Sequence, residues 1–217
     1  MFPLVAFTNY AKILLQLTGI ILIISSINFF LDIKSLTKKI SFYQKNNFYH
    51  NIFVLYILLY FFLSLSPLTS ADVLDYHAGT ALNILRFNKY ILLPEWFTGI
   101  QAGFGEVLIS LGFALGAEQF GSMVQFSSLL TISGIILKFN KKKFFFESNY
   151  FLILTILSCP ILIFLLSGNK PQIFFSALIF IAFSLNFTNL TKEKDLIKVY
   201  FLINLFICCA VLGKFSF

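Results

Sequence analysis

Residues 67–106 read PLTSADVLDYHAGTALNILRFNKYILLPEWFTGIQAGFGE, and they interrupt a chain that is otherwise apolar and almost free of carboxylates. Five of the nine acidic residues of the protein fall in or just after this stretch, namely Asp72, Asp75, Glu95, Glu106 and Glu118. His77, one of only two histidines, lies beside the first two acids. Because ionisable groups are costly to place in so apolar a chain, they tend to mark function. We therefore expect the functional site in this stretch.

The composition around this stretch is that of a membrane protein. The 217 residues are 59% hydrophobic and 12% charged, with a mean hydropathy of +0.89. Soluble domains average roughly 25% charged residues. We therefore predict an all-α, polytopic membrane protein with a single membrane domain over residues 1–217, located in a bacterial inner (plasma) membrane.

The net charge of +7 does not indicate nucleic acid binding. The lysines lie mainly in short stretches between apolar runs, at 32–50, 138–143 and 191–198. This is the positive-inside pattern of cytoplasmic loops. We predict membrane lipid as the partner of these charges, and no nucleic acid. The cysteines lie inside apolar runs without metal-ligand spacing, so we interpret them as reduced packing residues.

The apolar runs predict about six transmembrane helices, since a span needs ~20 residues at a rise of ~1.5 Å each. The runs are residues 13–31, 51–66, 119–137, 150–166, 173–190 and 199–213. A signal peptide is the alternative for the first run, but the basic residues follow that run instead of preceding it. The same charge bias places the N-terminus outside. Pro160 is expected to kink the fourth helix.

Residues 67–118 are predicted to form an extracytoplasmic loop with short juxtamembrane helices. Thr69 or Ser70 is a suitable cap for a helix that starts near Ala71. The apolar run at 104–116 has thirteen residues, which is short for a span. We therefore expect a juxtamembrane or partly dipping helix there.

The acidic stretch contains the residue types of a catalytic site. On a helix over 71–86, Asp72, Asp75 and Tyr76 would share one face. Two neighbouring carboxylates can split their pKa values, which gives one of them the role of proton acceptor. They can also hold a divalent cation through oxygen ligands. His77 would point about 100° away from Tyr76, so its membership of the site stays open.

Three further charged residues are candidates for binding. Arg86 is a candidate phosphate partner on the same segment. Glu106 precedes an apolar helix, where a carboxylate is stabilised by the helix N-terminus. Lys170, in the turn SGNKPQ at 167–172, is expected on the same side of the membrane as Asp72, with a lipid phosphate as its ligand. Helix capping and loop solvation are the simpler interpretations of all these charges.

The order of the segments resembles a known family. SADVLDYHAG is followed by ILRFNKYILLPEW, by GFGEVLISLGFALGAEQFGSMVQF, and then by a basic stretch. This order is similar to the N-terminal half of membrane glycosyltransferases of the GT-C type, the family-39-like group of protein O-mannosyltransferases and aminoarabinose transferases. The resemblance covers about residues 50–140. It matches Asp72 to the loop aspartate of the family and Tyr76 to its downstream aromatic residue.

The resemblance implies sugar transfer from a polyprenyl-phosphate-linked donor to an acceptor at the extracytoplasmic face. Asp72 would act as a general base on the acceptor hydroxyl or bind a metal, with Asp75 and His77 beside it and Glu106 at a position where relatives carry a polar residue. Arg86 and Lys170 would stabilise the leaving phosphate.

The chain also departs from the family, whose members usually carry more spans. An incomplete GT-C unit, such as a non-catalytic subunit or a fragment, is therefore an alternative, and a transporter is a further one.

Overall fold

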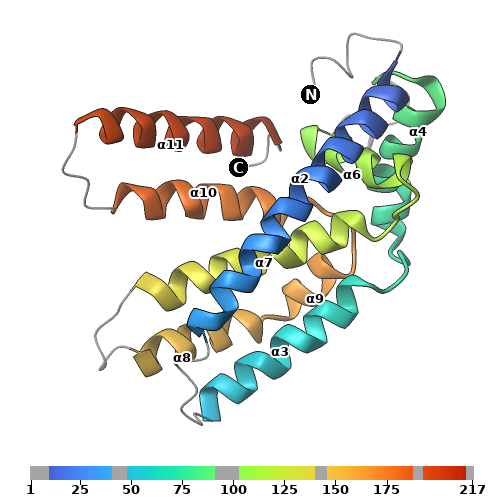
Figure 1. The fold of residues 1–217 in the computed structure, drawn as a ribbon. Helices are drawn as coiled ribbons and strands as arrows, with labels where there is room; N and C mark the ends of the chain where they lie inside the picture. Colours follow the sequence, from blue (N-terminus) through green and yellow to red (C-terminus); the bar gives the residue numbers. More distant parts are fainter. Residues whose placement is uncertain (1–9, 41–47, 91–102, 140–145, 188–192, 214–217) are drawn as a thin grey trace.

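The computed structural model describes residues 10–40, 48–90, 103–139, 146–187 and 193–213. Every regular element within these ranges is helical, which confirms the predicted all-α class (Figure 1). The elements are α2 (Ala11–Ile40), α3 (Phe48–Ser64), the π-helix η2 (Val73–Ala78), α4 (Gly79–Phe87), α6 (Phe104–Ala114), α7 (Phe120–Phe139), α8 (Phe146–Leu157), α9 (Pro160–Leu166), α10 (Gln172–Asn186) and α11 (Glu193–Gly213).

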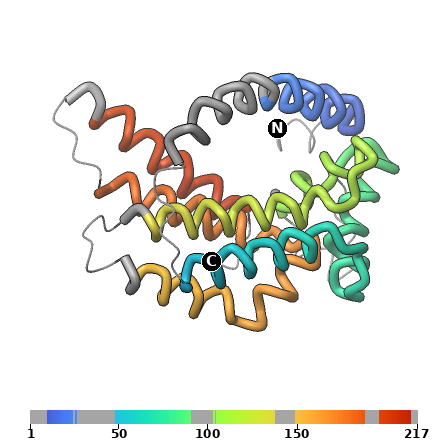
Figure 2. The backbone as a smooth tube through the Cα atoms, turned by 60° about the horizontal axis from the view of Figure 1, so that its bottom comes forward, coloured from blue at the N-terminus to red at the C-terminus, as the bar shows by residue number. Residues whose placement is uncertain are grey.

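The helices run alternately between two ends of the molecule (Figures 1 and 2). We call one of them the polar end. It consists of the end of α3, η2, the start of α6 and the turn 167–171 between α9 and α10. The described helix ends that flank the lysine-rich stretches lie at the opposite end, at the left of Figure 1. This separation agrees with the predicted sorting of charges.

Two helices are long and apolar enough to cross a membrane. They are α7 and α11, each of which contains an apolar window of 18 residues. The pair α8 and α9 makes a third if it is counted as one broken span, with a bend of 65°. The apolar helices α3 and α10 are shorter, with 17 and 15 residues. The arrangement with six crossings stays a prediction.

The break between α8 and α9 falls at the predicted proline. Pro160 has no N–H to donate to the preceding turn, so the helix stops at Leu157 and resumes at Pro160. The Tyr60 hydroxyl of α3 donates a hydrogen bond to the Leu157 carbonyl oxygen. The buried carbonyl at the break therefore has a partner, and the bend is fixed by a side chain from another helix.

Two helix boundaries differ by six residues or more from those predicted. The first helix continues to Ile40, past the expected end at residue 31, because residues 32–40 contain no glycine or proline that would stop it. The last helix starts at Glu193, six residues before the predicted start at 199. In both cases the predicted helix left out the charged residues at that end, although residues such as lysine and glutamate are good helix formers.

The short helix α6 ends in a tight reversal. The Ala117 N–H donates to the Gly112 carbonyl at 2.9 Å and the Gly116 N–H to the Phe113 carbonyl at 3.1 Å, with Gly116 at a φ of 74°. This is the Schellman arrangement, which requires the left-handed conformation that glycine adopts without strain. With 11 residues, α6 is too short to cross a membrane, as the sequence predicted for this run.

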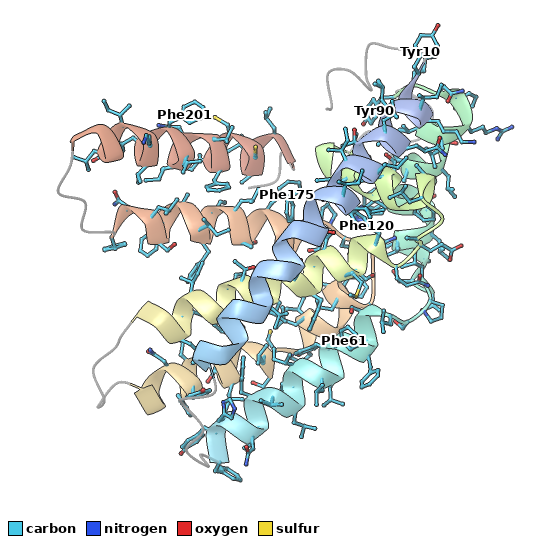
Figure 3. The ribbon with its side chains drawn as sticks, in the orientation of Figure 1. Tyr10, Phe61, Tyr90, Phe120, Phe175 and Phe201 are labelled. Carbon is cyan, nitrogen blue, oxygen red and sulfur yellow. The ribbon has the colours of Figure 1, made fainter. Side chains whose placement is uncertain are left out.

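The core is divided into two hydrophobic clusters. The larger one joins α3, α7, α8 and α9, where Phe61 packs on Phe126 with ring centroids 5.6 Å apart (Figure 3). The smaller one joins α2, α4 and α6, with Tyr90 and Phe120 packed against it (Figure 3). The second cluster packs α2 and α4 against α6, whose start belongs to the polar end.

Much of the remaining helix surface is apolar and exposed. On α11, Phe201 is 67% exposed and points away from the bundle, and Leu205 and Val211 are also exposed (Figure 3). Large exposed apolar surfaces mark contact with a membrane or another protein. Since backbone groups of helices are satisfied internally, such a surface suits lipid.

Candidate functional site

The site begins with an irregular helix at the polar end. The Ser70 hydroxyl accepts a hydrogen bond from the Val73 N–H at 3.3 Å, so the predicted cap is confirmed for Ser70. The helix then widens into the π-helix η2 before it returns to regular geometry at Gly79. Single π-helical turns are frequent at functional sites.

The π-helical turn changes which side chains share a face. Asp72 and Asp75 are exposed, whereas Tyr76 and His77 are both buried. The three residues of the predicted common face therefore differ in burial. Asp72 still lies near enough to Tyr76 for its charge to act on the phenol. The rings of Tyr76 and His77 lie together, with their centroids 3.9 Å apart.

His77 forms a buried pair with Glu106. Its Nδ1 lies 2.7 Å from Glu106 Oε1, and both side chains are almost fully shielded from solvent. The other carboxylate oxygen, Oε2, accepts a hydrogen bond from the Gly103 N–H at 2.6 Å. Glu106 thus caps α6, as its position before an apolar helix predicted, and it also connects α6 to η2.

Lys170 forms the second pair, with Asp72. Its ammonium group contacts the Asp72 Oδ2 and lies 3.5 Å from the centroid of the Phe164 ring. The lysine side chain is 5% exposed and the aspartate side chain 45%. A buried ammonium needs a partner for its charge, and here a carboxylate and an aromatic face supply it. Lys170 and Asp72 thus meet at the same end of the bundle.

The turn 167–171 brings Lys170 to this position. Asn169 Oδ1 accepts a hydrogen bond from the Ser122 N–H at 2.9 Å, and Asn169 Nδ2 donates to the Glu118 carbonyl at 2.9 Å. The side chain of Asn169 therefore caps α7 from outside that helix. On the other side of the turn, Gly168 lies so close to Val73 of η2 that a Cβ would be 2.6 Å from Val73 Cγ2.

The remaining predicted site residues lie apart from these pairs. Arg86 is exposed near the end of α4, with its guanidinium 5.5 Å from the Phe87 ring centroid. In the described ranges, no hydrogen bond or ion pair joins it to Asp72, His77 or Lys170. Asp75 is exposed on η2. Glu95 lies outside the described residues.

The described residues do not fit a divalent cation. Among them, no group of three or more histidine, cysteine, aspartate or glutamate side chains is placed to hold a metal ion. Asp72, the strongest candidate ligand, is paired with an ammonium group. We therefore derive no step from a metal.

The buried surroundings and the nearby carboxylates change the pKa of the Tyr76 phenol. Burial, together with the negative charges of Asp72 and Glu106, raises the pKa of the Tyr76 phenol to about 12. Burial and the charge of Glu106 also raise the pKa of Tyr90. Both phenols therefore keep their protons at neutral pH, and Tyr76 stays a hydrogen-bond donor beside the carboxylates.

The fold and the cluster define an all-helical protein with two or three helices suited to a membrane and a charged cluster at one end of the bundle. The chain belongs to the family described as the DUF1420 N-terminal domain, which it matches over residues 8–217. No curated protein and no solved structure matches it significantly.

Two residues of the site were not singled out in the sequence. Asn169 lies next to Lys170 in a short polar turn of an apolar chain. Its amide side chain could therefore have been chosen as a site residue from the sequence. Thr80 is buried three residues after His77, and its hydroxyl has no partner in the described part of the chain. A polar residue one turn from a histidine was a weaker signal.

Proposed function

We propose that this protein is a membrane glycosyltransferase of the GT-C type, which transfers a sugar from a polyprenyl-phosphate-linked donor to an acceptor at the extracytoplasmic face. The observation that supports this best is the pair of the buried Lys170 with the exposed Asp72, beside the buried pair of His77 with Glu106. Four ionisable groups from η2, α6 and the turn 167–171 converge at one end of an apolar bundle. Such clusters are costly and tend to be functional.

The lipid-linked phosphate would bind at Lys170. A phosphate is a strong acceptor for an ammonium group, so it competes with Asp72 for Lys170. When the bond between the sugar and the phosphate breaks, negative charge grows on the leaving phosphate. A fixed cation in surroundings of low polarity stabilises that charge. The exposed apolar helix surface suits a donor that arrives through the lipid.

Asp72 would act as the general base on the acceptor hydroxyl. Once the phosphate has taken over Lys170, the Asp72 carboxylate is released at the exposed side of the cluster. There it accepts the proton of the acceptor hydroxyl as that oxygen attacks the sugar. A positioned base contributes roughly 10²–10⁴-fold to the rate. Asp75 is exposed on the same turn, and Arg86 lies farther along the segment as a surface contact for lipid phosphate.

The test is transfer from labelled polyprenyl-phosphate sugars in membranes that contain the protein. Asp72→Asn and Lys170→Met should each lower transfer at least ~10²-fold, whereas Lys89→Gln, a change at an exposed lysine, should not. Each single variant also leaves a charge without its partner, which costs stability. The double variant Asp72→Asn with Lys170→Met removes both charges, so we expect it to regain thermal stability without regaining transfer.

A non-catalytic role is the second candidate, because both side-chain pairs can equally be structural contacts between elements. His77 with Glu106 joins η2 to α6, and Asp72 with Lys170 joins the start of the helix to the turn 167–171. Under this role the double variant would be indistinguishable from wild type in every assay. Transfer retained by the double variant would remove Asp72 and Lys170 from the proposed mechanism.

A further inference from the structure

Two buried polar atoms next to the cluster have no partner in the described part of the chain. They are His77 Nε2 and Thr80 Oγ1. His77 is fully buried and Thr80 is 5% exposed. A buried polar atom without a hydrogen bond costs about 1–3 kcal/mol. Such atoms therefore call for an explanation, and an absent ligand is one.

The pairing with Glu106 determines whether His77 Nε2 donates or accepts a hydrogen bond. Glu106 Oε2 accepts from the Gly103 N–H, so the carboxylate acts as an acceptor in this arrangement. Its Oε1 then accepts the proton on His77 Nδ1, over 2.7 Å. In a neutral imidazole the other nitrogen carries a lone pair. With the ring in this neutral form, His77 Nε2 is a hydrogen-bond acceptor, and Glu106 fixes its orientation.

Thr80 supplies the complementary group. Thr80 follows His77 by three residues, and both side chains are buried. Its hydroxyl both donates and accepts hydrogen bonds. A single hydroxyl of a ligand satisfies both atoms, since it donates to His77 Nε2 and accepts from Thr80 Oγ1. The π-helical turn that contains His77 gives independent support, because such turns are frequent at functional sites.

We propose that His77 Nε2 and Thr80 Oγ1 form a subsite that binds one hydroxyl group of a sugar. This proposal rests on the proposed function, because the sugar is the one carried by the lipid-linked donor. Glu106 acts as a positioning residue, which holds the ring of His77 in the accepting tautomer. Lys170 binds the phosphate of the same ligand.

The tautomer is tested first, on the full chain in detergent without any ligand. The protein has only two histidines, so a spectrum of protein labelled with ¹⁵N-histidine contains two rings, and His50→Gln identifies that of His77. We expect an unprotonated Nε2 at neutral pH in wild type and a changed tautomer in Glu106→Gln. A protonated Nε2 in wild type would overturn the subsite, whatever the transfer assays show.

The ligand is tested with two probes that differ only in the sugar. One is a short-chain polyprenyl phosphate and the other is the same lipid linked to a hexose, with glucose, mannose and galactose tried in turn. Both should raise the melting temperature, but only the sugar-bearing probe should shift the His77 Nε2 resonance. An equal shift with both probes indicates water or a general change, and it contradicts the subsite. If neither probe raises the melting temperature, donor binding and hence the proposed function fails.

Thr80→Val is the matching variant, with Thr18→Val as its control. Thr80→Val removes a hydroxyl without a partner, so the ligand-free protein should be at least as stable as wild type. The extra stabilisation by the sugar-bearing probe should be reduced severalfold. Thr18→Val removes a hydroxyl that donates only within its own helix, to the Leu14 carbonyl at 2.7 Å, so it should keep the response to sugar. A full response to sugar in Thr80→Val would overturn the role of Thr80.

Discussion

At the scale of single residues, the site is built from groups that the chain shields from water. Tyr76 and His77 are buried at the polar end, and the charges nearby come from Asp72, Glu106 and Lys170. Removing one member of such a pair leaves the other unsatisfied, which costs more than the pair itself contributes. Variants at this site therefore need a partner variant or a spectroscopic signal to separate function from folding.

The raised pKa of Tyr76 gives a prediction about pH. Its phenol has a pKa of about 12 in the folded protein and about 10 when exposed in the unfolded chain. Between these values the folded state holds the proton and the unfolded state releases it, so stability falls as the pH rises from 10 to 12. Tyr76→Phe lacks this ionisation. Between pH 10 and 12 its free energy of unfolding should therefore fall by roughly 1–2 kcal/mol less than that of wild type.

The measurement is the melting temperature of both proteins in detergent at several pH values between 9 and 12. The decrease should be less steep for Tyr76→Phe than for wild type. Tyr10→Phe is the control, because Tyr10 is 67% exposed, and it should follow the wild-type curve. Parallel curves for Tyr76→Phe and wild type would contradict the assignment.

At the scale of elements, the turn 167–171 organises the polar end. Asn169 caps α7, Lys170 reaches Asp72, and Gly168 contacts Val73 of η2. A five-residue polar turn between apolar helices is easily taken for a simple connection. Its contacts with α7 and η2 exist only after the helices have packed.

Gly168→Ala tests this turn. The new Cβ would lie 2.6 Å from Val73 Cγ2, so the turn or η2 must move, at a cost of about 1–3 kcal/mol. We expect a lower melting temperature and a loss of donor binding, since Lys170 lies only two residues after Gly168 in the same turn. Gly134→Ala on α7 is the matched control, because no atom lies within 4 Å of its Cβ position and alanine favours a helix by up to ~1 kcal/mol. Equal stability of the two variants would show that the turn tolerates displacement.

At the scale of the whole molecule, the two ends differ in charge. The acidic stretch and the turn 167–171 share the polar end, and the helix ends next to the lysine-rich stretches lie opposite (Figures 1 and 2). The positive-inside rule predicts that the polar end lies outside the cytoplasm. A donor at the outer face requires this orientation.

Labelling of single cysteines with a membrane-impermeant reagent tests the orientation. In a variant in which serine replaces Cys159, Cys208 and Cys209, Asp75→Cys should react in intact cells. Phe48→Cys, at the exposed start of α3 near the opposite end, should react only in inside-out vesicles. The reverse pattern would place the polar end in the cytoplasm and exclude a donor at the outer face.

The sequence by itself determined the helical class, the break at Pro160, the cap by Ser70 and the residues that carry charge in an apolar chain. These follow from local properties, namely composition, the missing N–H of proline and the spacing of polar residues. Only the tertiary structure decided that Asp72 meets Lys170, that His77 meets Glu106 and that Thr80 has no hydrogen-bond partner among the described residues. The physical reason is that these contacts join residues up to 98 positions apart, and that the π-helical turn rotates side chains away from the face that a regular helix would give them.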